Sequence, residues 1–130
     1  LYEENWKDLE AQGYLARVLC VEVRCEMNEL FLKEYKRQTT HWKRTQLYLA
    51  NPEKFFALQY LIRYHESRKD KILVFSDNIF LLTKYSKLLN KMCIHGKSSN
   101  EERIRVLDYF QKDDKYNVLF ISKVRKIILS

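Results

Sequence analysis

The fold of this chain is decided by one short apolar run, Lys71-Ile72-Leu73-Val74-Phe75-Ser76. An apolar run without alternating polar positions is typical of a strand that is buried on both faces of a parallel sheet. The polar pair Asp77-Asn78 follows at once and is suited to cap a helix over residues 79–90. We therefore predict a strand followed by a helix, which is the repeating unit of parallel α/β folds.

The alternation of strand and helix continues beyond this unit. A very short strand is expected at residues 92–94, and a buried strand at residues 116–121. Between them, Ser99 and Glu102 form a capping box for a helix that reaches about Lys112. The sequence thus predicts an α/β fold, with a central parallel sheet and helices on both faces.

The N-terminal half is also expected to be ordered. Asn51-Pro52-Glu53 is a strong helix start, because Asn caps and Pro suits the first helical position. The helix should bury Phe55, Leu58 and Ile62 and run to about Ser67. Before it we expect a lead-in helix or linker over residues 1–15 that stops at Gly13, a strand over 16–25, a helix over 28–37 capped by Asn28, and a loop or helix start over 38–46.

Composition narrows the class of protein. The chain has 130 residues, of which 46% are hydrophobic and 32% charged, with two Gly and one Pro, as suits one globular domain with a core. A net charge of +7 fits a polyanionic partner such as nucleic acid, although charge alone is unspecific. Three scattered Cys and three scattered His predict no metal site, and no apolar run approaches the roughly 20 residues that span a bilayer.

Polar residues gather where the predicted strands end. Ligands of open α/β sheets sit at the carboxyl ends of the strands, here near Ser76-Asp77-Asn78, His95-Gly96-Lys97 and Ser122-Lys123. Hydroxyl groups, amides and lysines at these ends could hold a DNA phosphate. The same residue types are typical of turns and helix caps, and spacing alone favours that simpler interpretation.

Two other patterns have weaker functional interpretations. Gly96-Lys97-Ser98 is similar to the end of a phosphate-binding P-loop, but the first Gly of that motif is replaced by Lys91. We therefore predict no nucleotide site there. The basic and aromatic stretches 33–37 and 41–44 could contact a nucleic-acid backbone, yet a solvated face with buried aromatics is the slightly favoured alternative.

Taken in order, several segments resemble the C-terminal motor domain of superfamily 2 helicases, and within it the XPB (xeroderma pigmentosum B) family. The resemblance covers nearly the whole chain through Val124. The segments that carry it are 1–6, 21–27, 51–55, 61–66, 71–78, 94–99 with Glu102-Arg103, and 120–124.

This resemblance implies an ATP-dependent DNA helicase or translocase of the TFIIH type, which acts in the nucleus in transcription initiation and nucleotide excision repair. Its implied partners are DNA, the first motor lobe and other TFIIH subunits, with no membrane. Residues 16–124 would be an incomplete RecA-like second lobe, 1–15 a lead-in from the first lobe, and 125–130 a divergent tail. ATP and Mg²⁺ would be bound by the full-length parent, and this chain alone is expected to bind neither and to hydrolyse no ATP.

The resemblance also assigns residues. Ser76-Asp77-Asn78 matches helicase motif IV, the next block places Gly96 at a turn and Arg103 in a helix, and Ser122-Lys123-Val124 matches the start of motif V. No catalytic residue is expected in this chain. The predicted DNA-binding residues are Asp77, Asn78, Gly96, Lys97, Ser98, Arg103, Ser122 and Lys123.

The chain departs from the family after Val124, where Arg125–Ser130 replaces the Gly-Asp continuation of motif V. One hypothesis is that translation ran into an unspliced intron after Lys123. Two other functions stay open. The chain could be a nucleic-acid-binding or TFIIH-interaction module without motor activity. It could also be a truncated, unstable fragment whose open sheet edge favours aggregation.

Overall fold

The computed structural model describes residues 5–123. The predicted tail at residues 125–130 therefore lies outside the described residues, as do Leu1–Glu4 and Val124 of the resembling segments. The elements, in chain order, are α1 (Trp6–Ala11), α2 (Glu29–Arg37), α3 (His41–Leu49), α4 (Pro52–Ser67), β1 (Ile72–Phe75), α5 (Ile79–Leu88), β2 (Met92–Ile94), α6 (Asn100–Lys112) and β3 (Val118–Ile121).

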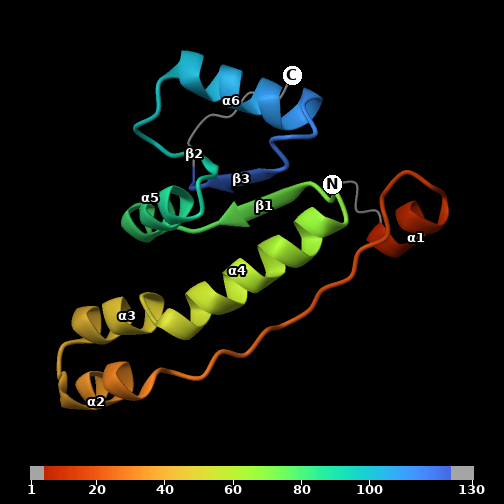
Figure 1. The fold of residues 1–130 in the computed structure, drawn as a ribbon. Coiled ribbons are helices and arrows are strands. Elements are labelled where there is room, and N and C mark those ends of the chain that lie inside the picture. The colour runs from red at the N-terminus through yellow and green to blue at the C-terminus, as the bar shows by residue number, and fades with distance from the viewer. Residues whose placement is uncertain (1–4, 124–130) are drawn as a thin grey trace.

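The three strands form one parallel sheet in the order β1-β3-β2 (Figure 1). In its register, Phe75 of β1 and Ile94 of β2 both lie opposite Ile121 of β3. The central strand β3 is buried along its whole length, and Leu119 and Phe120 are fully buried. The predicted α/β fold with a parallel sheet is confirmed.

Helices cover both faces of the sheet, as predicted (Figure 1). On one face, Ile62 of α4 and Leu82 of α5 pack with Val118 and Phe120. On the other face, α6 packs against a cluster formed by Ile94, Leu119 and Ile121. Burial raises the pKa of the Cys93 thiol in β2, so this cysteine belongs to the core.

The prediction that β1 is buried on both faces is wrong. Leu73 is 50% and Phe75 69% exposed, while Ile72 and Val74 pack against the core cluster of α4 and α5. The reason is position: β1 lies at the edge of the sheet, and α6 packs on β2 and β3. In α5, the Leu88 side chain is exposed as well.

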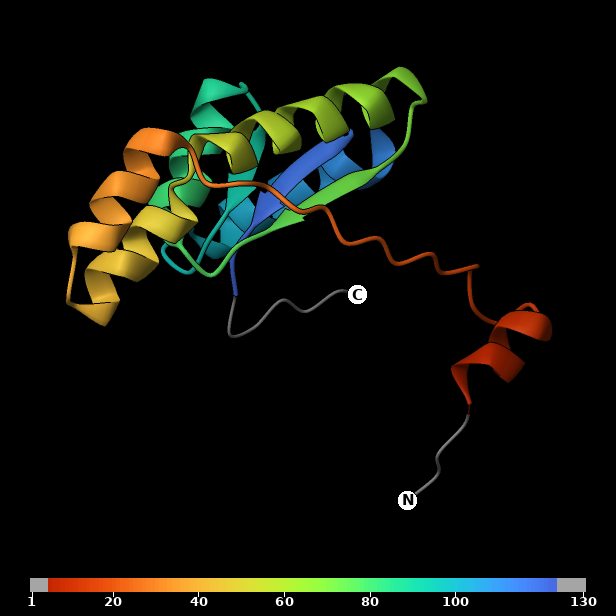
Figure 2. The same cartoon turned by 90° about the horizontal axis from the view of Figure 1, so that it is seen from below.

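The predicted strand at residues 16–25 is also wrong. These residues join α1 to α2 as an extended segment that pairs with no strand in the described part of the chain (Figures 1 and 2). Its apolar side chains are exposed, including Leu19 at 85%. β-branched residues favour an extended backbone, but a strand also requires a hydrogen-bonded neighbour, which periodicity cannot supply.

The helix starts were predicted more accurately. Asn28 and Asn51 cap α2 and α4, with side chains that accept from the backbone N–H groups of Leu30 and Glu53. The basic stretch 38–46 holds the start of α3, at His41. Gly13 ends the lead-in helix region with a φ of +81°, a conformation that favours glycine. No helix within residues 5–123 is long and apolar enough to cross a membrane.

Candidate nucleic-acid interface

The carboxyl ends of the three strands lie side by side at one edge of the sheet. The backbone N–H of Ser76 donates to the carbonyl of Ile121 at 3.3 Å, and that of Ser122 donates to the carbonyl of Ile94 at 3.0 Å. These two bonds extend the ladder beyond the strands. They bring three predicted segments together, namely Ser76-Asp77-Asn78, the turn that begins at His95, and Ser122-Lys123. We call this edge the ledge.

Charged groups at the ledge are accessible. Asp77 and Lys123 are exposed and line a shallow hollow of about 360 Å³, together with Phe75 and Ser76. Lys97 is exposed at the neighbouring turn. Two lysines of the predicted set therefore face solvent at the ledge, as a contact with phosphate requires.

Several polar residues near the strand ends cap helices or stabilise turns. The Asn78 side-chain oxygen accepts from Leu81 N at 3.0 Å and caps α5, while Ser76 Oγ accepts from Asn78 N at 3.2 Å. Ser99 caps α6 by accepting from Glu102 N at 3.2 Å. For Asn78 and Ser99, the simpler interpretation as capping residues describes what their side-chain oxygens do.

The turn after β2 is closed by its own hydrogen bonds. Ser98 is buried, and its Oγ accepts from His95 N at 3.2 Å while its own N–H donates to the His95 carbonyl at 3.0 Å. The Lys97 N–H donates to His95 Nδ1 at 3.2 Å, which places the neutral ring's proton on Nε2. A Cβ built on Gly96 would meet no atom within 4 Å, so the outside of this turn is open to a ligand.

Two buried polar atoms at the ledge have no hydrogen-bond partner within residues 5–123. They are Ser122 Oγ and Arg103 Nε. Ser122 is only 3% exposed, and a hydroxyl group buried without a partner costs free energy. Such groups often mark a position where a ligand or water completes the bonding. Within residues 5–123, no group of three or more potential metal ligands is found.

The two basic stretches form an α2–α3 hairpin that lies away from the sheet (Figure 1). Arg44 is used internally, because its Nε donates to the Gln38 carbonyl at 2.6 Å and its guanidinium lies 5.5 Å from the Tyr35 ring centroid. Lys36 and Lys43 are exposed, and Trp42 is 66% exposed. The hairpin thus combines a structural arginine with a free basic and aromatic surface.

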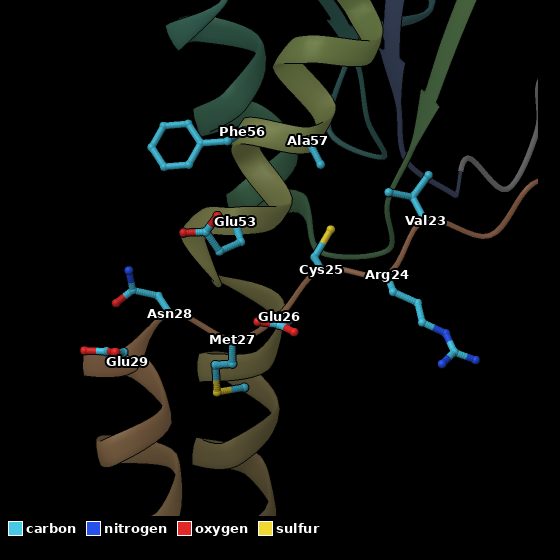
Figure 3. Close-up of a pocket in the computed structure, with 10 residues that line it drawn as sticks. All are labelled: Val23, Arg24, Cys25, Glu26, Met27, Asn28, Glu29, Glu53, Phe56 and Ala57. Atoms are coloured by element: carbon cyan, nitrogen blue, oxygen red, sulfur yellow. The ribbon is translucent and has the colours of Figure 1, made fainter.

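A second hollow, of about 480 Å³, lies between the extended segment and the start of α4 (Figure 3) and was not predicted. Its charged lining is mainly acidic, with Glu26, Glu29 and Glu53, and Arg24 points away from these carboxylates in Figure 3. An acidic lining repels phosphate, so this hollow does not belong to a nucleic-acid interface.

The family comparison covers nearly the whole chain. Residues 9–129 match the family described as ERCC3/RAD25/XPB C-terminal helicase. A helicase/translocase subunit XPB of the general transcription and DNA repair factor IIH from Dictyostelium discoideum is 50% identical over 124 residues. Proteins of the same description from Danio rerio and Saccharomyces cerevisiae are 50% and 48% identical. Each alignment covers 95% of this chain, which spans about 16%, 16% and 15% of the three relatives' lengths, respectively.

A solved structure supports the fold. The C-terminal domain of the SWI2/SNF2 ATPase from Sulfolobus solfataricus superposes with a TM-score of 0.57 at 17% identity, covering 78% of this chain and 62% of that one. At this identity the likeness bears on architecture alone. It agrees with the RecA-like lobe that the sequence predicted.

Proposed function

The chain belongs to the ERCC3/RAD25/XPB C-terminal helicase family, and we propose that it forms the DNA-gripping part of the second motor lobe of an ATP-dependent DNA helicase or translocase. The observation that carries this proposal lies at the carboxyl end of the central strand, where Lys123 is exposed and the neighbouring Ser122 Oγ has no hydrogen-bond partner within residues 5–123. A hydroxyl donor next to an ammonium group is a suitable pair for one phosphate of a DNA strand.

The proposed interface includes all eight residues that the sequence assigned. Lys97 and Lys123 supply charge, and Ser98 and Ser122 supply or support hydroxyl groups. The remaining members shape the edge on which the strand lies: Asp77 and Asn78 after β1, Gly96 at the turn, and Arg103 on α6. Because most such contacts would go to the DNA backbone, we expect affinity with little sequence preference.

In this proposal, residues 1–15 lead in from a first motor lobe and 16–124 are the incomplete second lobe. ATP and Mg²⁺ bind in the full-length parent. The chain lacks a complete P-loop motif, since Lys91 replaces its first Gly, and Lys91 instead forms an ion pair with Glu66. Closure of the two lobes around ATP would then move the grip on DNA.

The proposed partners are DNA, the first lobe and other TFIIH subunits, and the proposed location is the nucleus. These assignments rest on relatives that are described as subunits of the general transcription and DNA repair factor IIH. The basic α2–α3 hairpin offers a second surface that could follow a nucleic-acid backbone, with exposed Trp42 available for stacking.

The direct test is the salt dependence of binding to a single-stranded oligonucleotide, followed by fluorescence anisotropy. Lys123→Gln should weaken binding to all sequences and reduce the slope of log K against log salt by about 0.7, the value for one phosphate contact on a single strand. Lys115→Gln is the matched control, because it removes the same charge from an exposed residue just before the other end of β3. Equal slopes for both variants would refute the proposed contact.

The alternative function is a nucleic-acid-binding module without motor activity. It is favoured by the ledge and by the exposed basic and aromatic surface of the α2–α3 hairpin, neither of which needs a nucleotide. To distinguish the two, the chain would be added to the first motor lobe of a relative, and DNA-stimulated ATP hydrolysis would be measured. Stimulation that Lys123→Gln lowers supports the motor role, and DNA binding without stimulation supports the module.

A further inference from the structure

Arg103 of α6 turns back toward the end of β2. Its Nη2 donates to the Gly96 carbonyl at 3.0 Å and to the His95 carbonyl at 3.4 Å. Its Nε is buried without a partner. The guanidinium therefore bridges the first turn of α6 and the turn that carries Lys97.

The position of Arg103 is electrostatically unfavourable for the helix itself. It is the fourth residue of α6, near the positive end of the helix dipole, where cations destabilise a helix. Glu101 and Glu102 already supply the acidic groups that this end favours. The bonds from Arg103 to two carbonyl groups thus serve the turn rather than α6.

Apart from the Ser99 cap on Glu102 N, Arg103 makes the side-chain hydrogen bonds that join α6 to this turn among the described residues. The remaining bonds of the turn are internal and join His95 to Lys97 and Ser98. These internal bonds fix the shape of the turn, and the two bonds from Arg103 hold it against α6.

We infer that Arg103 is a positioning residue, which sets the turn, and with it Lys97, against the ledge instead of binding phosphate directly. This inference rests on the proposed function. Two of the three guanidinium nitrogens of Arg103 are engaged or enclosed, because Nη2 donates to both carbonyl oxygens and Nε is buried. The rigid guanidinium plane fixes the direction of these N–H groups, whereas the ammonium group of a lysine rotates about a flexible stem.

The test compares how the affinity for an oligothymidylate and its salt dependence change in four variants of the full chain. Arg103→Gln should weaken binding about tenfold, as expected when two ordinary hydrogen bonds no longer hold a binding turn, and leave the salt slope unchanged. Lys97→Gln should reduce the slope by about 0.7. Arg103→Lys should recover part of the affinity. Arg105→Gln removes the charge of an exposed arginine on the same helix. It should leave both the affinity and the salt slope nearly unchanged.

A second readout is independent of DNA. In ¹H–¹⁵N spectra of the free chain, Arg103→Gln should shift the amide signals of residues 95–98 and leave those of β1 and β3 in place. A slope reduction equal to that of Lys97→Gln would overturn the inference, because it would make Arg103 a phosphate contact. So would unchanged affinity, or amide shifts spread over the whole chain. If the unmodified chain binds no DNA at any salt concentration, the proposed function fails, and the spectra alone then decide whether Arg103 positions the turn.

Discussion

Asn51 holds together two parts of the chain that are distant in sequence. Its side chain is 2% exposed, accepts from the N–H groups of Asn28 and Glu53, and donates to the Glu26 carbonyl at 2.9 Å. It therefore caps α4 and fastens the end of the extended segment. The sequence indicated the cap but not the link, because the cap depends on the next residues and the link depends on a chain segment 23 residues away.

Asn51→Ala should destabilise the chain by about 3 kcal/mol, since a lost cap costs about 1 kcal/mol and buried groups left without partners cost about 1–3 kcal/mol. Asn28→Ala is the control: it also removes a cap, but its side chain makes a single hydrogen bond, to Leu30 N. Its cost should be about 1 kcal/mol. Urea unfolding of both variants gives the comparison, and equal losses would mean that the link to the extended segment contributes nothing.

Gly96 is expected to matter for binding and not for folding. Its φ lies outside the left-handed region and a Cβ meets no atom, so Gly96→Ala should change the free energy of unfolding by less than about 1 kcal/mol. The new methyl group would project into the space where we place the DNA backbone, and should lower affinity in the anisotropy assay. Gly13→Ala should lower the free energy of unfolding and leave affinity unchanged, because φ at Gly13 is +81° and Gly13 closely follows α1, which lies away from the carboxyl ends of the strands (Figure 1). Unchanged affinity for Gly96→Ala would show that DNA does not approach this turn.

At the scale of elements, the sequence predicted most of what local chemistry determines. Caps at Asn28, Asn51, Asn78 and Ser99 define four helix starts, and each lies where expected. The sequence-based prediction failed where the outcome depends on a neighbouring element. The exposure of Leu73 in β1 depends on where α6 packs, and the unpaired state of residues 16–25 depends on which strand edges lie nearby.

The ledge likewise combines one feature that the sequence could predict with one that it could not. Register in a parallel sheet brings the strand ends together, so the meeting of Ser76, His95 and Ser122 could be expected from the strand positions alone. The use of Arg103 as a bridge could not, because the direction of a long side chain is set by the carbonyl groups within its reach. The family resemblance singled out Arg103 as a DNA-binding residue in the helix after the turn, and gave no sign of a bridge.

Two leucines test the correction at residues 16–25. Leu19 in the extended segment is 85% exposed, whereas Leu119 in β3 is fully buried. The same substitution at both positions should therefore differ in cost: Leu119→Ala about 2–5 kcal/mol, and Leu19→Ala within about 0.5 kcal/mol. Denaturant unfolding measures both. A large loss for Leu19→Ala would mean that the segment packs as a strand in solution.

At the scale of the whole molecule, the described sheet has two edge strands, β1 and β2, and β1 exposes more apolar surface because the residues of β2 are half-buried or buried. Within the described residues β1 pairs with β3 alone, so its outer edge presents unpaired backbone groups. Leu73 and Phe75 add exposed apolar surface at the same place. An open, apolar strand edge favours edge-to-edge association of chains, and a charged side chain on the edge opposes it.

We therefore expect the isolated chain to associate as its concentration rises, through β1. Leu73→Lys should suppress this association, because the charge sits on the open edge and must be desolvated when a second strand approaches. Leu30→Lys is the matched control, since Leu30 is 73% exposed on α2 and gives the same change in net charge away from the sheet. Light scattering over a concentration series, at a salt concentration high enough to screen net repulsion, separates the two. Equal protection by both substitutions would assign the effect to net charge, and a monodisperse unmodified chain would show that the β1 edge does not drive association.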